Sequence, residues 1–350
     1  MPQRGRSRGR SRATQRGKLF VSLGLAGATL AAVGTVGLVS VGDREAVEAR
    51  GIVLERFVAA AVGGRREPTR GGGCGWSQQR STRAALGAAY AEARGARAIP
   101  PDLVFAFYDH THNADEVAAA LREFGTRRFL GEATATGLLT PDGPLSASDP
   151  ALGLVVADIG DALVGLGGAS VADGSDATEV AHVAFLRAQD DVGSALPSGD
   201  PTLVLFRTTD VDVASVRDRL QEVAGEDVPV LGGRSATVGG GALLVNGAKI
   251  ARGTAVVLFF ASEPIGWCES PNAQLTLAVE GMRSQGGGCA GLLHFARSTD
   301  AASAASLPSS DLLPADLPWL GIVVPAGAGT RPRSSALLLP AARSRHAATD

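Results

Sequence analysis

The sequence predicts a mixed α/β fold with mixed parallel/antiparallel sheets built from repeated strand–helix–strand units. Two observations predict it. A unit made of an apolar run, an amphipathic segment and a second apolar run that leads into a Gly-rich loop occurs three times. Between and after these units lie apolar runs joined by short turns, which is the pattern of antiparallel strands.

The first unit shows how the prediction is made. It begins with PDLVFAFYDH (101–110), continues through NADEVAAALREFG (113–125) and ends with FLGEATATG (129–137). A short continuous apolar run is typical of a buried strand, and the middle segment places Val117 and Leu121 on one face of a helix. Such a crossover predicts two parallel strands with the helix covering one side of them.

The other two units repeat this order. The second comprises segments 200–210, 212–225 and 230–241, and the third comprises 291–300 and 319–329 around a Ser/Pro-rich middle. In the three units, the last Phe of the first strand precedes the glycine of a Leu-Gly pair by 24, 26 and 26 residues. This regular spacing predicts that the units arose by duplication.

Further segments complete the predicted elements. Residues 78–97 favour a helix with Ser81 as its N-cap. Segments 152–160 and 162–171 are predicted as strands joined by a tight turn. Segment 242–261 predicts a hairpin, because it carries Asn-Gly, the strongest short hairpin signal, at 246–247. Upstream, residues 43–62 favour a helix, and the Gly-rich segment 63–75 is predicted as a linker.

Composition bounds the class of protein. The chain has 350 residues, of which 45% are hydrophobic and 19% charged, so it can bury a substantial core. Its net charge of −2 argues against a general nucleic-acid binder. Seven basic residues and no acid lie in 1–18, which leaves 26 basic against 35 acidic residues in the remainder. Three widely spaced cysteines without a CxxC motif exclude a disulfide framework and a Cys-based zinc site.

The uncharged segment 19–42 could reach across a membrane. As a helix its 24 residues would span about 36 Å, against a hydrocarbon core of about 30 Å. The basic flank before it predicts a single anchor with the bulk of the protein outside the cell membrane. Two alternatives remain open. In the first, the segment is a cleaved signal peptide and the protein is secreted. In the second, translation starts downstream of the segment and the protein is cytoplasmic.

The two Gly-rich loops that follow parallel strands are the candidate ligand site, because ligands of open α/β sheets bind beyond the carboxyl ends of strands. Glycines permit close backbone approach, and Glu132 and Arg234 could hold the ammonium and carboxylate of a zwitterion. The alternative is that the glycines serve turns and the charges are solvated. The candidate residues are Gly131, Glu132, Thr134, Thr136, Gly137, Gly232, Gly233, Arg234 and Ser235.

No catalytic constellation is recognisable in the sequence. It has no phosphate-binding Gly motif with its lysine and no GxSxG elbow, so we expect a non-enzyme, with an enzyme of unknown reaction as the less favoured alternative. We expect no bound metal. The alternative function is a gas or redox sensor that binds haem as its cofactor, with His112 or His182 as the haem ligand.

With these pieces in order, the chain resembles the FIST family of sensory domains, found in bacterial and other signal-transduction proteins. The resemblance rests on segments 75–93, 101–109, 130–137, 200–206, 230–241 and 245–260. It implies a sensor that binds a small molecule, with an amino acid or a similar polar metabolite as ligand, and haem in some members. It implies no enzymatic activity. Any output would pass to a downstream signalling protein.

The resemblance also divides the chain. Segment 75–262 corresponds to the N-terminal FIST part and 263–340 to a shortened C-terminal part. The remaining segments are a basic tail (1–18), the hydrophobic segment (19–42), a helix with linker (43–74) and a C-terminal tail (341–350).

Overall fold

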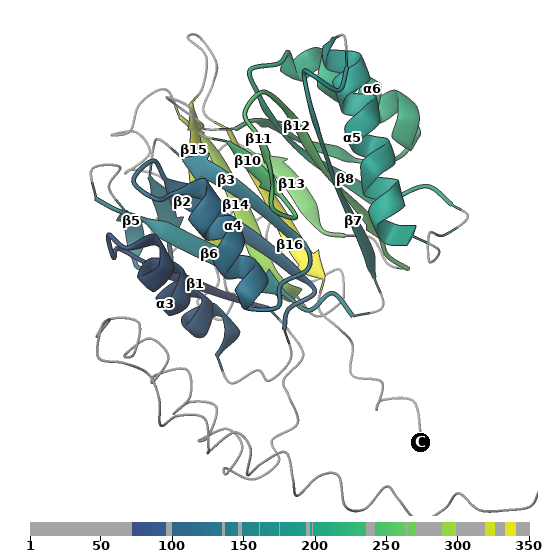
Figure 1. Cartoon of the computed structure of the whole chain (residues 1–350). Coiled ribbons are helices and arrows are strands. Elements are labelled where there is room, and N and C mark those ends of the chain that lie inside the picture. Colours follow the sequence, from purple (N-terminus) through teal and green to yellow (C-terminus); the bar gives the residue numbers. More distant parts are fainter. Residues whose placement is uncertain are drawn as a thin grey trace, which may run out of the picture. The chain divides into compact units, whose positions relative to one another are not determined.

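The structure, a computed structural model, describes residues 72–95, 100–134, 137–145, 149–160, 162–174, 176–193, 197, 199–235, 242–262, 265–270, 289–298, 319–325 and 333–340. All of them lie in the unit Glu45–Asp350. The described part contains four helices and three sheets, so the mixed α/β prediction is confirmed (Figure 1). The helices are α3 (Thr82–Arg94), α4 (Ala114–Glu123), α5 (Ala177–Val192) and α6 (Val213–Ala224).

The first sheet has the strand order β1-β6-β2-β3-β10-β11 and the second has the order β7-β12-β8-β9. The strands of the first are β1 (Gly73–Ser77), β6 (Leu152–Ala157), β2 (Leu103–Asp109), β3 (Phe129–Thr134), β10 (Leu243–Val245) and β11 (Ala248–Ile250). Those of the second are β7 (Leu163–Ser170), β12 (Gly253–Phe260), β8 (Leu203–Thr209) and β9 (Val230–Arg234).

The third sheet has the order β13-β16-β14-β15-β4-β5. Its strands are β13 (Trp267–Ser270), β16 (Arg333–Pro340), β14 (Cys289–Ser298), β15 (Trp319–Pro325), β4 (Leu138–Thr140) and β5 (Gly143–Leu145). Strand β4 follows the first repeat along the chain but pairs with β15 of the third. This pairing brings the segment after the first repeat into the sheet of the third repeat.

Each predicted repeat supplies one parallel strand pair, and each pair lies in a different sheet. The pairs are β2–β3, β8–β9 and β14–β15. Helix α4 connects the first pair and α6 the second, which confirms the predicted crossovers. The middle of the third repeat, 299–318, lies outside the described residues.

The strand faces correct one detail of the repeat alignment. Phe107 and Phe295 both belong to the core between the sheets, whereas Phe206 belongs to the core beneath the helices of the second sheet. Aligning the repeats on these three phenylalanines is therefore off by one residue in the second repeat. Successive side chains of a strand alternate between faces, so a shift of one residue exchanges them.

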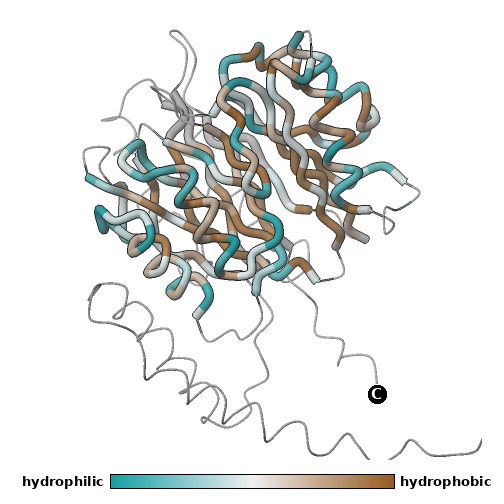
Figure 2. The backbone as a smooth tube through the Cα atoms, in the orientation of Figure 1, coloured by the Kyte–Doolittle hydropathy of each residue, from teal (hydrophilic) through white to brown (hydrophobic). Residues whose placement is uncertain are grey.

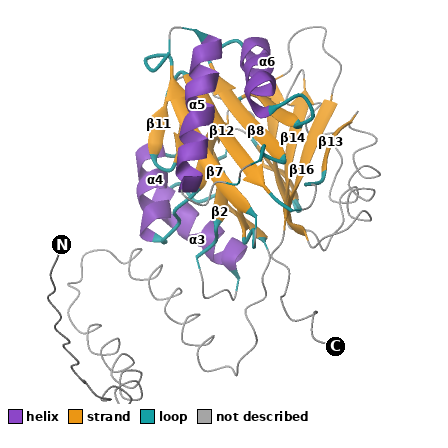
Figure 3. Ribbon diagram, turned by 90° about the vertical axis from the view of Figure 1, so that its right-hand side faces the viewer, coloured by secondary structure: helices purple, strands orange, loops and turns teal. Residues whose placement is uncertain are grey.

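Three hydrophobic cores hold the layers together. One lies between the sheets and draws residues from all three. A second lies between the first sheet and helices α3 and α4, and a third between the second sheet and helices α5 and α6. Figure 2 shows the hydrophobic residues concentrated along the strands, and Figure 3 shows α5 and α6 over β7, β12 and β8. Burial of this apolar surface is the main stabilising contribution.

Local sequence signals account for the helix starts. Ser81 caps α3 as predicted, because its hydroxyl accepts a bond from the amide of Ala84. Asn113, Asp176 and Asp212 cap the other three helices in the same way. These side chains satisfy amide groups that the first helical turn leaves without a carbonyl partner.

The predicted Asn-Gly hairpin is confirmed as β10–β11. Asn246 and Gly247 both have positive φ, 50° and 89°, as the tight turn between two adjacent antiparallel strands requires. Strand β12, which follows this hairpin, pairs with β7 and β8 in the second sheet rather than with β11. The chain thus changes sheets directly after the hairpin.

Segments 152–160 and 162–171 contain strands as predicted, but the tight turn between them does not make a hairpin. Strand β6 pairs with β1 and β2, whereas β7 pairs with β12. The turn therefore carries the chain from the first sheet to the second. Sequence proximity alone gave no indication of this separation.

The predicted linker 63–75 ends earlier than expected, because β1 begins at Gly73 and pairs with β6. Gly75 lies in this strand, and α3 packs directly against it. A Cβ atom at Gly75 would lie 2.2 Å from the carbonyl oxygen of Ala89. The glycine-rich composition here reflects close helix–strand packing. The helix expected at 43–62 lies outside the described residues.

No helix within the described part of the chain is long and apolar enough to cross a membrane. The hydrophobic segment 19–42 lies outside that part.

Candidate functional site

The candidate site lies where the parallel strands of the first two repeats end. Glu132 belongs to β3, and its side chain is 1% exposed. Strand alternation places it on the face that carries Leu130, toward the core between the sheets. Its carboxylate therefore needs a partner inside the protein, because an unpaired buried charge is costly.

That partner is Arg207 of β8, whose side chain is 3% exposed. Its Nε and Nη2 donate to Oε2 and Oε1 of Glu132, each at 2.7 Å. Nη2 also donates to the carbonyl oxygen of Arg234 at 2.8 Å. A bidentate guanidinium–carboxylate pair is among the strongest polar contacts in proteins. It joins the first sheet to the second.

The third sheet adds an aromatic ring to this junction, the Glu132–Arg207 contact between the first and second sheets. The guanidinium of Arg207 lies over Phe295 of β14, with Cζ 4.8 Å from the ring centroid. Phe295 in turn meets Phe107 of β2 edge to face, with centroids 6.4 Å apart. The cation over the ring face adds a favourable electrostatic contact. Residues from all three sheets thus surround one buried, net-neutral ion pair.

Arg234 does not join Glu132. It is exposed, and alternation along β9 points it away from the face that carries Leu231. It lies near Asp212 at the start of α6. Hydrogen bonds from the amide and hydroxyl of Ser215 lower the pKa of Asp212, and the nearby Arg234 charge adds a smaller contribution. Its contribution to the junction is its backbone carbonyl.

The peptide group that joins Arg234 to Ser235 also makes a bond on its N–H side. The Ser235 amide donates to the carbonyl oxygen of Thr208 at 2.7 Å, which continues the β8–β9 ladder one residue beyond β9. Alternation therefore puts the Ser235 side chain on the face of Gly233 and Arg207. The side chain is buried, at 3% exposure, and its hydroxyl has no hydrogen-bond partner among the described residues.

The predicted glycines serve packing in two cases. A Cβ at Gly131 would lie 3.0 Å from the side chain of Leu244. Gly232 has φ +143°, and a Cβ there would lie 2.0 Å from the carbonyl oxygen of Phe206. Gly233 is buried and pairs with Arg207 across β8 and β9. Gly131 and Gly232 thus have a structural reason for being glycine apart from any ligand.

The remaining predicted residues of the first loop close off the end of β3. Thr134 is buried, and its hydroxyl donates to the carbonyl oxygen of Gly137 at 3.2 Å. Gly137 has φ +92°, a conformation that favours glycine. Thr136 lies outside the described residues. Next to this loop, burial raises the pKa of Tyr108 above its ordinary value, and its hydroxyl donates to the carbonyl oxygen of Ala242 at 3.1 Å.

The two candidate haem ligands lie apart in the chain: His112 belongs to the first repeat, and His182 lies between the first and second repeats. His112 follows β2 and is 4% exposed, and neither ring nitrogen has a partner among the described residues. Burial lowers its pKa below the ordinary value, against the opposing charges of Asp109 and Glu116. His182 lies on α5, where Nδ1 is 2.9 Å from Nη2 of Arg219 on α6. Within the described ranges, no three His, Cys, Asp or Glu side chains gather as a metal site would require.

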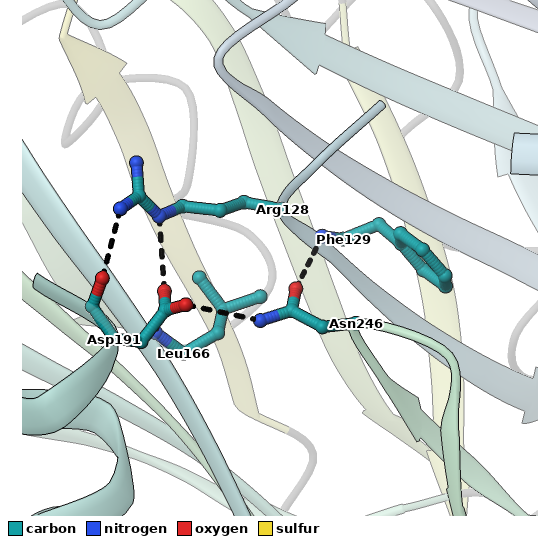
Figure 4. Close-up of polar contacts among 5 residues, drawn as sticks. All are labelled: Arg128, Phe129, Leu166, Asp191 and Asn246. Atoms are coloured by element: carbon teal, nitrogen blue, oxygen red, sulfur yellow. Dashed lines mark hydrogen bonds and ion pairs between the residues drawn. The ribbon is translucent and has the colours of Figure 1, made fainter. Parts of the chain in front are cut away.

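A second polar bridge joins the first two sheets (Figure 4). Arg128 donates from Nε to Oδ2 of Asp191 at 2.9 Å and from Nη2 to its carbonyl oxygen at 3.0 Å. Asp191 also accepts from the amide of Leu166 at 3.1 Å and from Nδ2 of Asn246 at 3.4 Å. Asn246 Oδ1 accepts from the amide of Phe129 at 3.1 Å. This bridge lies at the amino end of β3, and the Glu132–Arg207 pair lies toward its carboxyl end.

Sequence reasoning missed Arg207, Phe295 and the role of Phe107. A signal for Arg207 is present in the segment LVLFRTT, where one arginine interrupts an otherwise apolar strand. A charged residue in a buried strand predicts a buried partner. Its partner could not be chosen from sequence, because Glu132 lies 75 residues earlier.

Comparisons with known proteins agree with the resemblance. Residues 102–270 match the sequence model of the FIST N domain. No curated protein matches the chain. Among solved structures, the crystal structure of cyanuric acid hydrolase from A. caulinodans is similar at 13% identity and a TM-score of 0.41, covering 77% of this chain and 98% of that one. No conclusion about function is drawn from a likeness of this size.

FIST domains are sensory domains that bind small ligands and signal onward. The matched segment includes β2, β3, β8 and β9, and with them Glu132, Arg207 and Ser235. Residues 102–270 of this protein are therefore a FIST N domain.

Proposed function

We propose that this protein senses a small polar metabolite, with an amino acid as its preferred ligand, and that it acts by binding rather than by catalysis. The observation that carries the proposal is the buried Glu132–Arg207 pair near the carboxyl ends of parallel strands. Such strand ends are the usual place for ligands of α/β sheets.

The charges of the junction favour a zwitterion. Glu132 and Arg207 cancel each other, so a ligand of net charge leaves the buried site unbalanced, which is costly at low dielectric. An amino acid brings one charge of each sign. Each oxygen of a carboxylate has two lone pairs, so Glu132 can accept from a ligand ammonium while it still accepts from Arg207.

Ligand screening tests the proposal. Full-length protein is heated with each of the twenty L-amino acids in turn, and those that raise the melting temperature are measured by calorimetry. We expect a subset to stabilise the fold, because a ligand that binds only the native state shifts the unfolding equilibrium. If none of the twenty binds the intact protein, the amino-acid proposal is wrong.

The route of the signal depends on segment 19–42. As a membrane anchor it places the sensor outside the cell, and output then requires a partner there or a change passed through the segment. Membrane fractionation with sequencing of the native N-terminus distinguishes this arrangement from a secreted or a cytoplasmic protein. An N-terminus located beyond residue 42 in the membrane-free fraction contradicts the anchor.

A further inference from the structure

A buried serine, Ser235, directly follows Arg234, whose carbonyl oxygen accepts from Arg207 of the ion pair. The side chain of Ser235 is 3% exposed, and its Oγ makes no hydrogen bond among the described residues. Buried hydroxyls are nearly always hydrogen-bonded, because leaving one unsatisfied destabilises the fold. Since the described residues offer this hydroxyl no acceptor, a bound ligand could supply one.

The position of Ser235 associates it with Arg207. The peptide group that joins residues 234 and 235 is bound on both sides. Its carbonyl accepts from Nη2 of Arg207 at 2.8 Å, and its N–H donates to the carbonyl oxygen of Thr208 at 2.7 Å. This fixed peptide holds the Ser235 side chain on the same face as the guanidinium. Gly233, which pairs with Arg207 between them, adds no side chain.

Arg207 itself has donors that its present contacts do not use. Its bonds to Glu132 and to the Arg234 carbonyl employ Nε and Nη2. None of the hydrogen bonds that join Arg207 to described residues uses Nη1. A guanidinium carries five N–H groups in a fixed plane, and two of them belong to Nη1. The face of the guanidinium is occupied by Phe295, so a new acceptor must approach in the plane, at the Nη1 edge.

We propose that Arg207 Nη1 and Ser235 Oγ together bind the carboxylate of the ligand, with Glu132 holding the guanidinium in place. This assignment rests on the proposed function and deepens it, because it names the residues that select an α-carboxylate. Arg234, the arginine that the loop motif suggests, takes no part through its side chain, since it is exposed and on the opposite face.

The test compares four proteins with two probes. The ligands are the amino acids that stabilise the wild type. Each is used in two forms, the free acid and the α-carboxamide, which lacks the negatively charged carboxylate. The variants are Ser235→Ala, Arg234→Ala and Ser215→Ala. Ser215 is the matched serine control, because its hydroxyl donates to Asp212 at 2.7 Å on α6. Melting temperature without ligand and Kd are measured for each.

We expect opposite behaviour from the two serines. Ser235→Ala leaves the ligand-free melting temperature unchanged or higher, because it removes an unsatisfied hydroxyl, and weakens Kd about 10-fold or more. Ser215→Ala lowers the melting temperature and leaves Kd unchanged. Arg234→Ala leaves Kd within about 2-fold, and the carboxamides bind the wild type at least about 10-fold more weakly than the acids.

The two levels of the proposal fail in different ways. A wild type that binds none of the amino acids overturns the proposed function and this assignment with it. A wild type that binds while Ser235→Ala binds equally tightly overturns the assignment alone, as does a loss of binding in Arg234→Ala. Arg207→Lys provides a further check. It keeps the charge but lacks the planar donor set, and unchanged binding in a folded variant also contradicts the assignment.

Discussion

The carboxylate of Glu132 and the guanidinium of Arg207 form a bidentate pair in which both N···O distances are 2.7 Å. The two residues are 75 positions apart and come from different repeats and different sheets. Both side chains are almost completely buried. The pair therefore holds β3 of the first sheet to β8 of the second.

Removal of one partner of this pair should destabilise the protein strongly. Glu132→Ala leaves Arg207 buried without its counter-charge, at a cost of about 3–5 kcal/mol in the free energy of unfolding. The double variant Glu132→Leu/Arg207→Met should recover most of this loss, because it leaves no unpaired charge. Urea unfolding of the two variants measures both effects. Glu123→Ala is the control, since its pair with Arg83 is exposed and worth at most about 1 kcal/mol. Equal losses in the two single variants would contradict the prediction.

His112 should make the protein less stable as pH falls. Burial lowers its pKa in the folded state below 6.5, so the unfolded chain binds a proton at pH values where the folded chain does not. The stability that this histidine contributes is therefore present above about pH 6.5 and is lost as pH falls below it, by about 1.4 kcal/mol for each unit of lowered pKa. Unfolding measured from pH 7.5 to 5 should show a smaller loss for His112→Leu than for the wild type.

The control for this experiment is the exposed His110, two residues away. The variant His110→Gln should keep the pH dependence of the wild type. Identical pH profiles for His112→Leu and the wild type would show that His112 is not the group responsible.

Two glycines should respond in opposite directions to alanine. Gly247 has φ +89°, and a Cβ there would lie 1.8 Å from Nη2 of Arg122, so Gly247→Ala should destabilise by about 1–2 kcal/mol. Gly87 lies inside α3 with nothing within 4 Å of its Cβ position, so Gly87→Ala should stabilise by about 0.5–1 kcal/mol. Thermal unfolding of the two variants measures the contrast. A destabilising Gly87→Ala would mean that this helix face is not open.

Asp191 should matter far more than its neighbour Asp190. Asp191 accepts bonds from Arg128, Leu166 and Asn246, so Asp191→Ala leaves several donors without their partner and should cost about 2 kcal/mol. Asp190 is exposed, and Asp190→Ala should change the stability by less than about 0.5 kcal/mol. Denaturant unfolding compares them. If the two losses are equal, the bridge in Figure 4 is not important for the stability of the fold.

Much of the fold could be predicted because its signals are local. The apolar runs predicted β2, β3, β8 and β9, Ser81 predicted the start of α3, and Asn-Gly predicted the turn between β10 and β11. Each signal spans a few residues whose backbone preferences hold wherever the segment is placed. The loops at the ends of β3 and β9 were also predicted, and with them Glu132 and Ser235 as candidate residues.

The partners of those residues could not be predicted in the same way. Glu132 was paired with Arg234 because both lie in similar loops, but side chains of a strand alternate, and Arg234 falls on the outer face. The same one-residue ambiguity misaligned Phe206 with Phe107 and Phe295. A shift of one residue in the alignment of two strands hardly changes their composition or apolar pattern. It does move a charged side chain from the buried face to the exposed face.

The sequence by itself determined the strand pairs of the three units, their order and the residue types at their strand ends. The tertiary structure decided that the units lie in three sheets, that β6 and β7 separate although they are adjacent in the chain, and that Arg207 rather than Arg234 meets Glu132. The physical reason is that local periodicity is set by backbone geometry, while charge pairing in a core is set by which strands meet across it and by the cost of leaving a buried charge alone.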